Sequence, residues 1–193
     1  MRKIIASEFT SADGYIVGPA EDMSWVMNNF NEEMAKYAGD LMQSMDTVMF
    51  GRVTYQIMAN AWPNLTEKQS PGADKMNSAL KVVLSRTLNQ APWGSYEPAT
   101  IIKDDVERRV SELKRGSGKN IVIYGSANLV QSLTRLGLID EYQLLVHPVF
   151  LGSGKLLFGQ MAQPVNLKLL RAQTFSNGVN VLCYEPKTTS STR

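Results

Sequence analysis

Apolar runs alternate along the chain with longer amphipathic stretches. The runs have the length and the β-branched and aromatic content of strands, and turn residues bound most of them. The predicted strands are KIIASEF, DTVMFG, KVVLS, ATIIK, NIVIYG, EYQLLVHPVF, NLKLLRAQTF and VNVLCYE.

Helices are predicted between several of these strands. The segment 31–45 places Met34, Ala38, Leu41 and Met45 on one face, and Asn31 is suited to cap its first turn. A second apolar stripe runs through 128–136, and Gly137 would end that helix. The mixed-charge segment DDVERRVSELKR repeats valine and leucine at helical spacing, which indicates a solvated amphipathic helix.

The order of these elements predicts the fold class. Strands alternate with helices over the first two thirds, which is typical of a mostly parallel sheet covered on both faces. After Leu138 only strand-like runs follow, and Asn177-Gly178 predicts a β-hairpin. We therefore expect one α/β domain over 1–186 with an antiparallel C-terminal hairpin, followed by a disordered tail over 187–193.

Composition narrows the class of protein. The 193 residues are 44% hydrophobic and carry a net charge of +2 that is spread along the chain, so we expect neither a nucleic-acid nor a membrane partner. The N-terminus lacks the apolar region of a signal peptide, which together with a lone cysteine predicts a cytoplasmic protein. A lone histidine, His147, lacks metal-ligand spacing, so no zinc site is expected.

Three predicted strands are each followed by small and polar residues, and two of them by an arginine. The ends carry Gly51-Arg52-Val53-Thr54, Ser85-Arg86-Thr87 and Gly125-Ser126-Ala127-Asn128. Ligands of open α/β sheets gather at the carboxyl ends of strands, where glycine permits close approach, helix N-termini bind phosphate and arginine adds a charged fork. The set predicts an anionic, phosphorylated ligand. Each end alone is equally consistent with an ordinary turn and helix cap.

The standard nucleotide-binding fingerprints are missing. Neither Gly116-Ser117-Gly118 nor Gly152-Ser153-Gly154 continues to a third glycine at the Rossmann spacing. The following Lys119 and Lys155 lack the serine or threonine of a P-loop. We expect loops there, of which the one ending at Lys155 could border the site.

Four motifs, taken in order, carry a family resemblance. SEFTSADGYIVG, GRVTY, LSRTL and YGSANLVQSL resemble the dihydrofolate-reductase-like superfamily. The chain is most similar there to the reductase domain of bacterial riboflavin biosynthesis, the C-terminal half of bifunctional deaminase-reductases. The resemblance runs from about Lys3 to Tyr184 and implies a single dihydrofolate-reductase-like domain, an NADPH cofactor and, because relatives are often dimers, a homodimer joined through the C-terminal third.

The resemblance also implies which residues bind the cofactor. Its phosphates would meet Gly51, Arg52 and Thr54, with Thr54 starting a helix, and its 2′-phosphate would lie beside Ser85 and Arg86. The pyrophosphate would pass over Gly125, Ser126, Ala127 and Asn128. Folate reductases often have two adjacent glycines at this last turn, so a serine fits only if Ser126 does not need a positive φ.

Catalytic candidates are acidic residues near the expected nicotinamide. The resemblance brings Asp13 beside the ring, and Glu33, or its neighbour Glu32, to the place where folate reductases bind the pterin. The alternatives are a turn role for Asp13 and a helix-dipole role for Glu33. The implied reaction reduces 5-amino-6-(5-phosphoribosylamino)uracil or a related heterocycle. Dihydrofolate reduction and nucleotide binding without turnover remain the alternatives.

Overall fold

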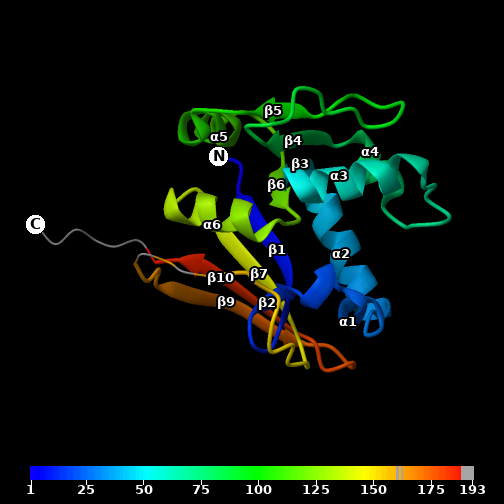
Figure 1. Ribbon diagram of the computed structural model, residues 1–193, viewed down its shortest axis with the longest axis vertical. Coiled ribbons are helices and arrows are strands. Elements are labelled where there is room, and N and C mark those ends of the chain that lie inside the picture. Colours follow the sequence, from blue (N-terminus) through cyan, green and yellow to red (C-terminus); the bar gives the residue numbers. More distant parts are fainter. Residues whose placement is uncertain (160, 162, 188–193) are drawn as a thin grey trace, which may run out of the picture.

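The computed structural model describes residues 1–159, 161 and 163–187, so the predicted tail lies outside them apart from Lys187. Figure 1 shows the arrangement of the elements. In chain order they are β1 (Ile4–Ser11), β2 (Tyr15–Val17), η1 (Pro19–Glu21), α1 (Ser24–Met27), α2 (Glu32–Ser44), β3 (Met45–Gly51), α3 (Arg52–Ala61), η2 (Trp62–Asn64), α4 (Ala73–Ser78), β4 (Leu80–Leu84), β5 (Thr100–Ile102), α5 (Val106–Arg115), β6 (Asn120–Ile123), α6 (Ala127–Arg135), β7 (Glu141–His147), β8 (Lys155–Leu156), β9 (Leu167–Thr174) and β10 (Asn180–Pro186).

One sheet organises the described part of the chain. Its eight strands lie in the order β5-β4-β3-β6-β1-β7-β10-β9. The strands from β5 to β7 are parallel, and β10 runs antiparallel to both of its neighbours. The predicted α/β fold, with a mostly parallel sheet and an antiparallel C-terminal hairpin, is confirmed.

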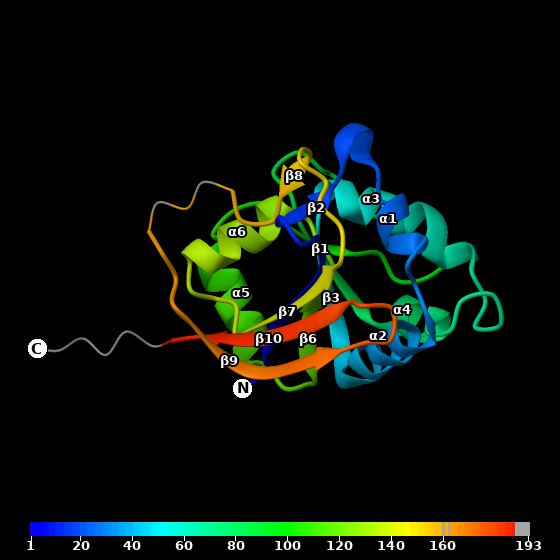
Figure 2. The same ribbon diagram turned by 90° about the horizontal axis from the view of Figure 1, so that it is seen from below.

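Helices cover both faces of the sheet. Figures 1 and 2 show α5 and α6 on one side and α2, α3 and α4 on the other. Alternation along β1 sends Ile4 and Ala6 into the core under α5 and α6, and Ile5 into the core under α2 and α3. Because both faces are buried, the central strands read as continuous apolar runs.

Local signals end and cap these elements where the sequence predicts. The Asn31 side chain accepts a hydrogen bond from the Met34 N–H at 3.0 Å and so caps α2. Gly137 takes φ +63° just after α6, and Gly178 takes φ +83° in the β9–β10 hairpin.

The structure differs from the sequence-based prediction at short elements. Strand β7 ends at His147 rather than continuing to residue 150, because Pro148 cannot donate to the ladder. Helix α3 begins at Arg52 rather than at Thr54. Strands β2 and β8 form a small two-stranded ribbon that the sequence pattern does not predict.

Candidate active site

A cleft of about 540 Å³ lies at the carboxyl ends of β3, β4, β5 and β6. It is the place where an open α/β sheet binds ligands. Of the predicted cofactor residues, those that line it are Gly51, Arg52, Ser85, Arg86, Ser126 and Asn128. Gly125 and Ala127 flank Ser126, and Thr54 follows Val53, which also lines the cleft. The structure therefore brings the three strand ends together in one site.

The cleft is cationic. Its described lining includes Arg52, Arg86, Lys103 and Lys155 and contains no carboxylate. Arg52 makes one long hydrogen bond, from Nη1 to Gln56 Oε1 at 3.3 Å, and Lys103 donates to Asn89 Oδ1 at 2.8 Å. Neutral partners leave these positive charges uncompensated, so the cleft favours an anion.

Two helices begin in the cleft. The N-termini of α3 and α6 follow Gly51 and Ser126 directly, and the first amide N–H groups of a helix attract anions. The Gly51 N–H donates to the Gly125 carbonyl at 3.3 Å, so the two turns touch. A Cβ on Gly51 would lie 2.5 Å from Ser126 Oγ, which explains glycine at this close approach.

The backbone of the Gly125-Ser126 turn can accommodate a serine at its second position. Gly125 takes φ +69°, whereas Ser126 takes φ −93°, which any residue can adopt. The peptide bond between them is cis. Ser126 thus occupies the second position of the turn without left-handed backbone.

Ser85 shapes the turn that carries Arg86. Its hydroxyl accepts hydrogen bonds from the Leu88 N–H at 3.1 Å and the Thr87 N–H at 3.3 Å. This is the ordinary capping role of a strand-end serine. The turn leaves the Arg86 side chain exposed at the mouth of the cleft.

A buried acid, Glu8, stands next to the Gly125 turn. The residue is 6% exposed, and Oε1 accepts the Gly125 N–H at 2.7 Å. Burial raises the pKa of Glu8 from 4.5 to about 8, although the Gly125 N–H opposes the shift by stabilising the carboxylate. At neutral pH this carboxyl group is therefore mostly in its acid form.

Asp13 stabilises a loop through hydrogen bonds. It accepts hydrogen bonds from the Ser11 hydroxyl at 2.6 Å and from the N–H groups of Gly152 at 2.8 Å and Leu151 at 3.2 Å. The Ser11 hydroxyl, with the two N–H groups, holds the pKa of Asp13 below its ordinary value. Asp13 is outside the lining of the cleft and ties the turn after β1 to the loop before β8.

Glu33 lies on an exposed surface, away from the cationic cleft. It accepts from the Ser176 hydroxyl and, at 2.7 Å, from the Ser176 N–H, and these bonds lower its pKa. The neighbouring Glu32 is also exposed. Glu33 thus joins the first turn of α2 to the β9–β10 hairpin, and the structure does not bring it together with the strand ends.

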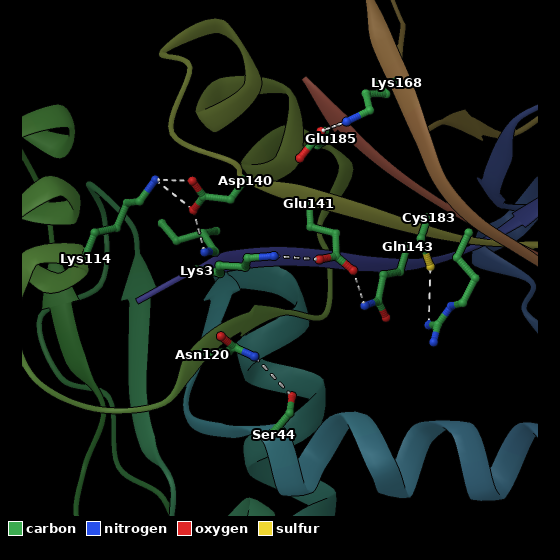
Figure 3. A network of polar contacts seen from close by, with 12 residues as sticks. Lys3, Ser44, Lys114, Asn120, Asp140, Glu141, Gln143, Lys168, Cys183 and Glu185 are labelled. Atoms are coloured by element: carbon green, nitrogen blue, oxygen red, sulfur yellow. Dashed lines mark hydrogen bonds and ion pairs between the residues drawn. The ribbon is translucent and has the colours of Figure 1, made fainter. Parts of the chain in front are cut away.

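A larger hollow of about 840 Å³ lies on the α2 side, over the first halves of β1 and β7. Its charges compensate one another. Lys3 pairs with Glu141 at 3.5 Å, and Figure 3 shows Glu141 also accepting from Gln143. The cationic cleft, with no internal carboxylate, is therefore the stronger candidate for an anionic ligand despite its smaller size.

An aromatic cluster closes the carboxyl ends of β1 and β7. His147 packs edge-on against Trp25 and Phe9, with ring centroids at 5.0 and 5.6 Å. Burial lowers the pKa of His147, and its Nε2 has no hydrogen-bond partner among the described residues. The imidazole is thus a buried neutral group.

Two kinds of site find no support in the part of the chain that the structure describes. No group of three or more His, Cys, Asp or Glu side chains is placed to hold a metal ion. No helix there is both long and apolar enough to cross a bilayer.

The sequence prediction did not include Glu8 or Lys103. Glu8 has the same inward parity as Ile4 and Ala6, which is a signal for a buried carboxyl group. Lys103 directly follows β5, so the rule that selected Arg86 also applies to it.

Comparisons with known proteins identify the family. The RibD C-terminal domain matches residues 2–181. The uncharacterized protein YyaP of Bacillus subtilis is 32% identical over 188 residues, covering 95% of this chain and 94% of its own length. Both matches extend over nearly the whole chain.

Solved structures share the fold. A putative riboflavin biosynthesis protein from Shewanella sp. PV-4 superposes with a TM-score of 0.77 at 21% identity, covering 96% of this chain and 99% of that one. Dihydrofolate reductase from Enterococcus faecalis, complexed with NADP(H) and RAB-propyl, superposes with a TM-score of 0.62 at 13% identity and covers 96% of both chains. The chain belongs to the RibD C-terminal domain family and has the dihydrofolate-reductase-like fold.

Proposed function

We propose that the protein is an NADPH-dependent reductase acting on a heterocyclic or ribosylated pyrimidine or pteridine. The observation that carries the proposal is the charge of the cleft, where Arg52, Arg86, Lys103 and Lys155 gather without a carboxylate among the described lining residues. A dinucleotide with a pyrophosphate and an additional 2′-phosphate matches a cleft whose cations are spread over several strand ends.

Each part of the cleft has a role in this proposal. Arg52 and the N-termini of α3 and α6 bind the pyrophosphate, while Arg86 and Lys103 bind the 2′-phosphate. The dihydronicotinamide supplies the hydride when it is bound. The residues of the chain bind the dinucleotide, orient its reacting end towards β1 and exclude water there.

The first substrate to test is 5-amino-6-(5-phosphoribosylamino)uracil. Membership of the RibD C-terminal domain family supports this choice over dihydrofolate. Dihydrofolate is the second candidate because the fold is shared with a dihydrofolate reductase. A nucleotide-binding protein without turnover is the third.

Calorimetric titration with NADPH and NADH tests the cofactor. We expect the wild type to prefer NADPH. Arg86→Ala should weaken NADPH binding by about 10- to 100-fold, because one charge-assisted phosphate contact contributes about 1.5–3 kcal/mol, and should leave NADH binding nearly unchanged. Arg115→Ala, an exposed arginine in the last turn of α5, is the control and should alter neither affinity.

The outcomes separate the parts of the proposal. Equal affinities of the wild type for NADPH and NADH contradict the role of Arg86, and failure to bind either dinucleotide refutes the function. NADPH oxidation with the pyrimidine or with dihydrofolate then identifies the substrate class. Binding without oxidation of NADPH by either substrate favours the protein without turnover.

A further inference from the structure

Strands β1 and β6 part before they reach the candidate site. Their ladder consists of Ile4 with Ile121, Ile5 with Val122 and Ala6 with Ile123. Beyond Ala6, β1 pairs with β7 alone, through to Ser11 opposite His147. The backbone ladder between β1 and β6 therefore ends at Ala6, and we call the stretch without backbone pairing between their carboxyl ends the gap. Ligands of α/β sheets bind outside the carboxyl ends of the strands, where neighbouring strands part.

The side chain of Glu8 spans this gap. Glu8 and Gly125 each lie two residues beyond the last pair, Ala6 with Ile123, so a continued ladder would set them opposite one another. In place of a backbone contact, Glu8 Oε1 accepts the Gly125 N–H at 2.7 Å. Its second oxygen, Oε2, forms no hydrogen bond within the described part of the chain, and it lies 3.7 Å from the position of an added Gly125 Cβ.

Among the described residues, no charged group compensates Glu8. Glu8 lies on the same face of β1 as Ile4 and Ala6. The residues of α6 that pack with Ile4 and Ala6 are the apolar Leu129, Val130 and Leu133. From α3 comes the neutral Thr54 hydroxyl, 3.2 Å from the same added Cβ. Tyr124, the nearest titratable residue in the turn, packs with the core on the opposite face.

This environment keeps Glu8 in its acid form at neutral pH. Burial outweighs the Gly125 N–H and raises the pKa of Glu8 to about 8, and no charged group contributes to the shift. With Oε1 accepting from Gly125, the acid proton on Oε2 has no acceptor within the described residues. Oε2 is not one of the fully buried atoms without a partner, so it keeps accessible surface, where a ligand can accept its proton.

The direction of the cleft brings the reacting end of a dinucleotide to this gap. Arg86 and Lys103 follow β4 and β5, whereas Arg52 and Ser126 follow β3 and β6. A dinucleotide with its 2′-phosphate at the first pair and its pyrophosphate at the second points towards β1, the next strand in the sheet.

The other candidate acids are held as carboxylates. Asp13 accepts from Ser11, Leu151 and Gly152, and Glu33 accepts from Ser176, so in both cases the donors favour the ionised form. An anion whose oxygens already accept several hydrogen bonds has no proton to give. Of these three acids, Glu8 is the one that holds a proton at neutral pH.

We propose that Glu8, from its place in the gap between β1 and β6, donates the proton that completes reduction of the substrate; this role rests on the proposed reductase function. The carbon of a C=N or C=O bond in the substrate would receive the hydride that bound NADPH would supply, with oxidation of NADPH to NADP⁺. The nitrogen or oxygen of that bond takes the proton from Glu8 Oε2, and the C–N or C–O double bond becomes single. Glu8 is left as a carboxylate that the Gly125 N–H stabilises, and water restores its proton after the product leaves.

Glu8→Gln tests proton transfer while preserving shape. The amide oxygen still accepts from Gly125 and the NH₂ group still donates, but it has no acidic proton. We expect kcat with NADPH and 5-amino-6-(5-phosphoribosylamino)uracil to fall by about 100-fold or more, with the dissociation constant of NADPH within about threefold of wild type. Glu112→Gln, on the exposed face of α5, is the matched control and should keep wild-type kcat.

Infrared spectroscopy of the ligand-free protein provides a readout that does not depend on activity. The difference between wild type and Glu8→Gln should contain the C=O stretching band of a protonated carboxyl group at pH 7, and the band should disappear with a midpoint near pH 8. Absence of the band at pH 7, or a kcat of Glu8→Gln equal to that of wild type, overturns the proposal. A wild type that never oxidises NADPH refutes the reductase function and the donor role with it, whereas turnover that survives Glu8→Gln refutes the donor role alone.

Discussion

Glu8→Gln should also change how stability depends on pH. The pKa of Glu8 rises from 4.5 to about 8 on folding, so between these values the folded chain retains a proton that the unfolded chain has lost. Folding then takes up a proton, and the free energy of unfolding falls as the pH rises through this window. Each pKa unit corresponds to about 1.4 kcal/mol, which makes the total loss about 5 kcal/mol. That loss is comparable with the whole stability of many domains.

The glutamine variant removes this contribution. Below pH 4.5 the wild-type carboxyl group is protonated in both states, so the two proteins should differ by about 1 kcal/mol or less. Above pH 8 the variant should be the more stable by about 5 kcal/mol, because an amide has no charge to bury. Urea unfolding followed by circular dichroism from pH 4 to pH 9 at constant ionic strength measures the difference.

A carboxylate that is already exposed provides the control. Glu112→Gln removes an exposed carboxylate and should shift stability by about 0.5 kcal/mol or less at every pH. Wild-type and Glu8→Gln profiles that stay parallel from pH 4 to pH 9 would mean that burial does not hold Glu8 in its acid form. Glu8 would then hold no proton to donate at neutral pH.

Other substitutions test the remaining parts of the site. Arg52→Ala should weaken NADPH and NADH alike by about 10-fold in calorimetry, because both carry the pyrophosphate; an effect on NADPH alone would contradict this assignment. Asp13→Asn should lower kcat more than NADPH affinity in steady-state assays, and unchanged kcat would restrict Asp13 to its loop role. Gly125→Ala should lower the free energy of unfolding by about 1–2 kcal/mol in urea titrations, since φ +69° strains a residue with a Cβ; a neutral result would show that the turn relaxes. His147 has a lowered pKa, so the free energy of unfolding of wild type minus that of His147→Phe should fall as the pH drops below 6.5, because the unfolded chain takes up the proton first; a difference that does not change with pH would disprove it.

Much of the fold was predictable because its signals are local. Alternation and apolar runs located the long strands, Asn31 marked the start of α2, and Asn177-Gly178 marked the hairpin. The β2–β8 ribbon was not predicted because its two strands are very short and are far apart in the sequence. Its pairing depends on tertiary contacts, for which a short sequence window carries no pattern.

The candidate site was predictable where position alone determines chemistry. Residues that follow strands of a parallel sheet meet at one edge, so Arg52 and Arg86 were identified without coordinates. The acids required more information. Asp13 and Glu33 are satisfied by N–H groups of residues 151–152 and 176, distant in sequence, which only the folded chain brings near. The pKa of Glu8 likewise depends on its burial.

The central position of β1 has a consequence for synthesis on the ribosome. β1 is synthesised before the other strands of the sheet, yet its neighbours in the sheet are β6 and β7, and Glu8 meets Gly125 117 residues later in the chain. The sheet therefore cannot close around its central strand until most of the chain has left the ribosome, and such long-range pairing is slow.

During that wait the nascent run Ile4-Ile5-Ala6 is exposed and prone to aggregate with other chains. Glu8 has its ordinary acidity in the unfolded chain and is charged at neutral pH. The carboxyl group that becomes a buried acid in the folded protein thus places a negative charge beside this aggregation-prone run before folding. Replacing Glu8 with glutamine should therefore lower the yield of soluble protein during rapid expression.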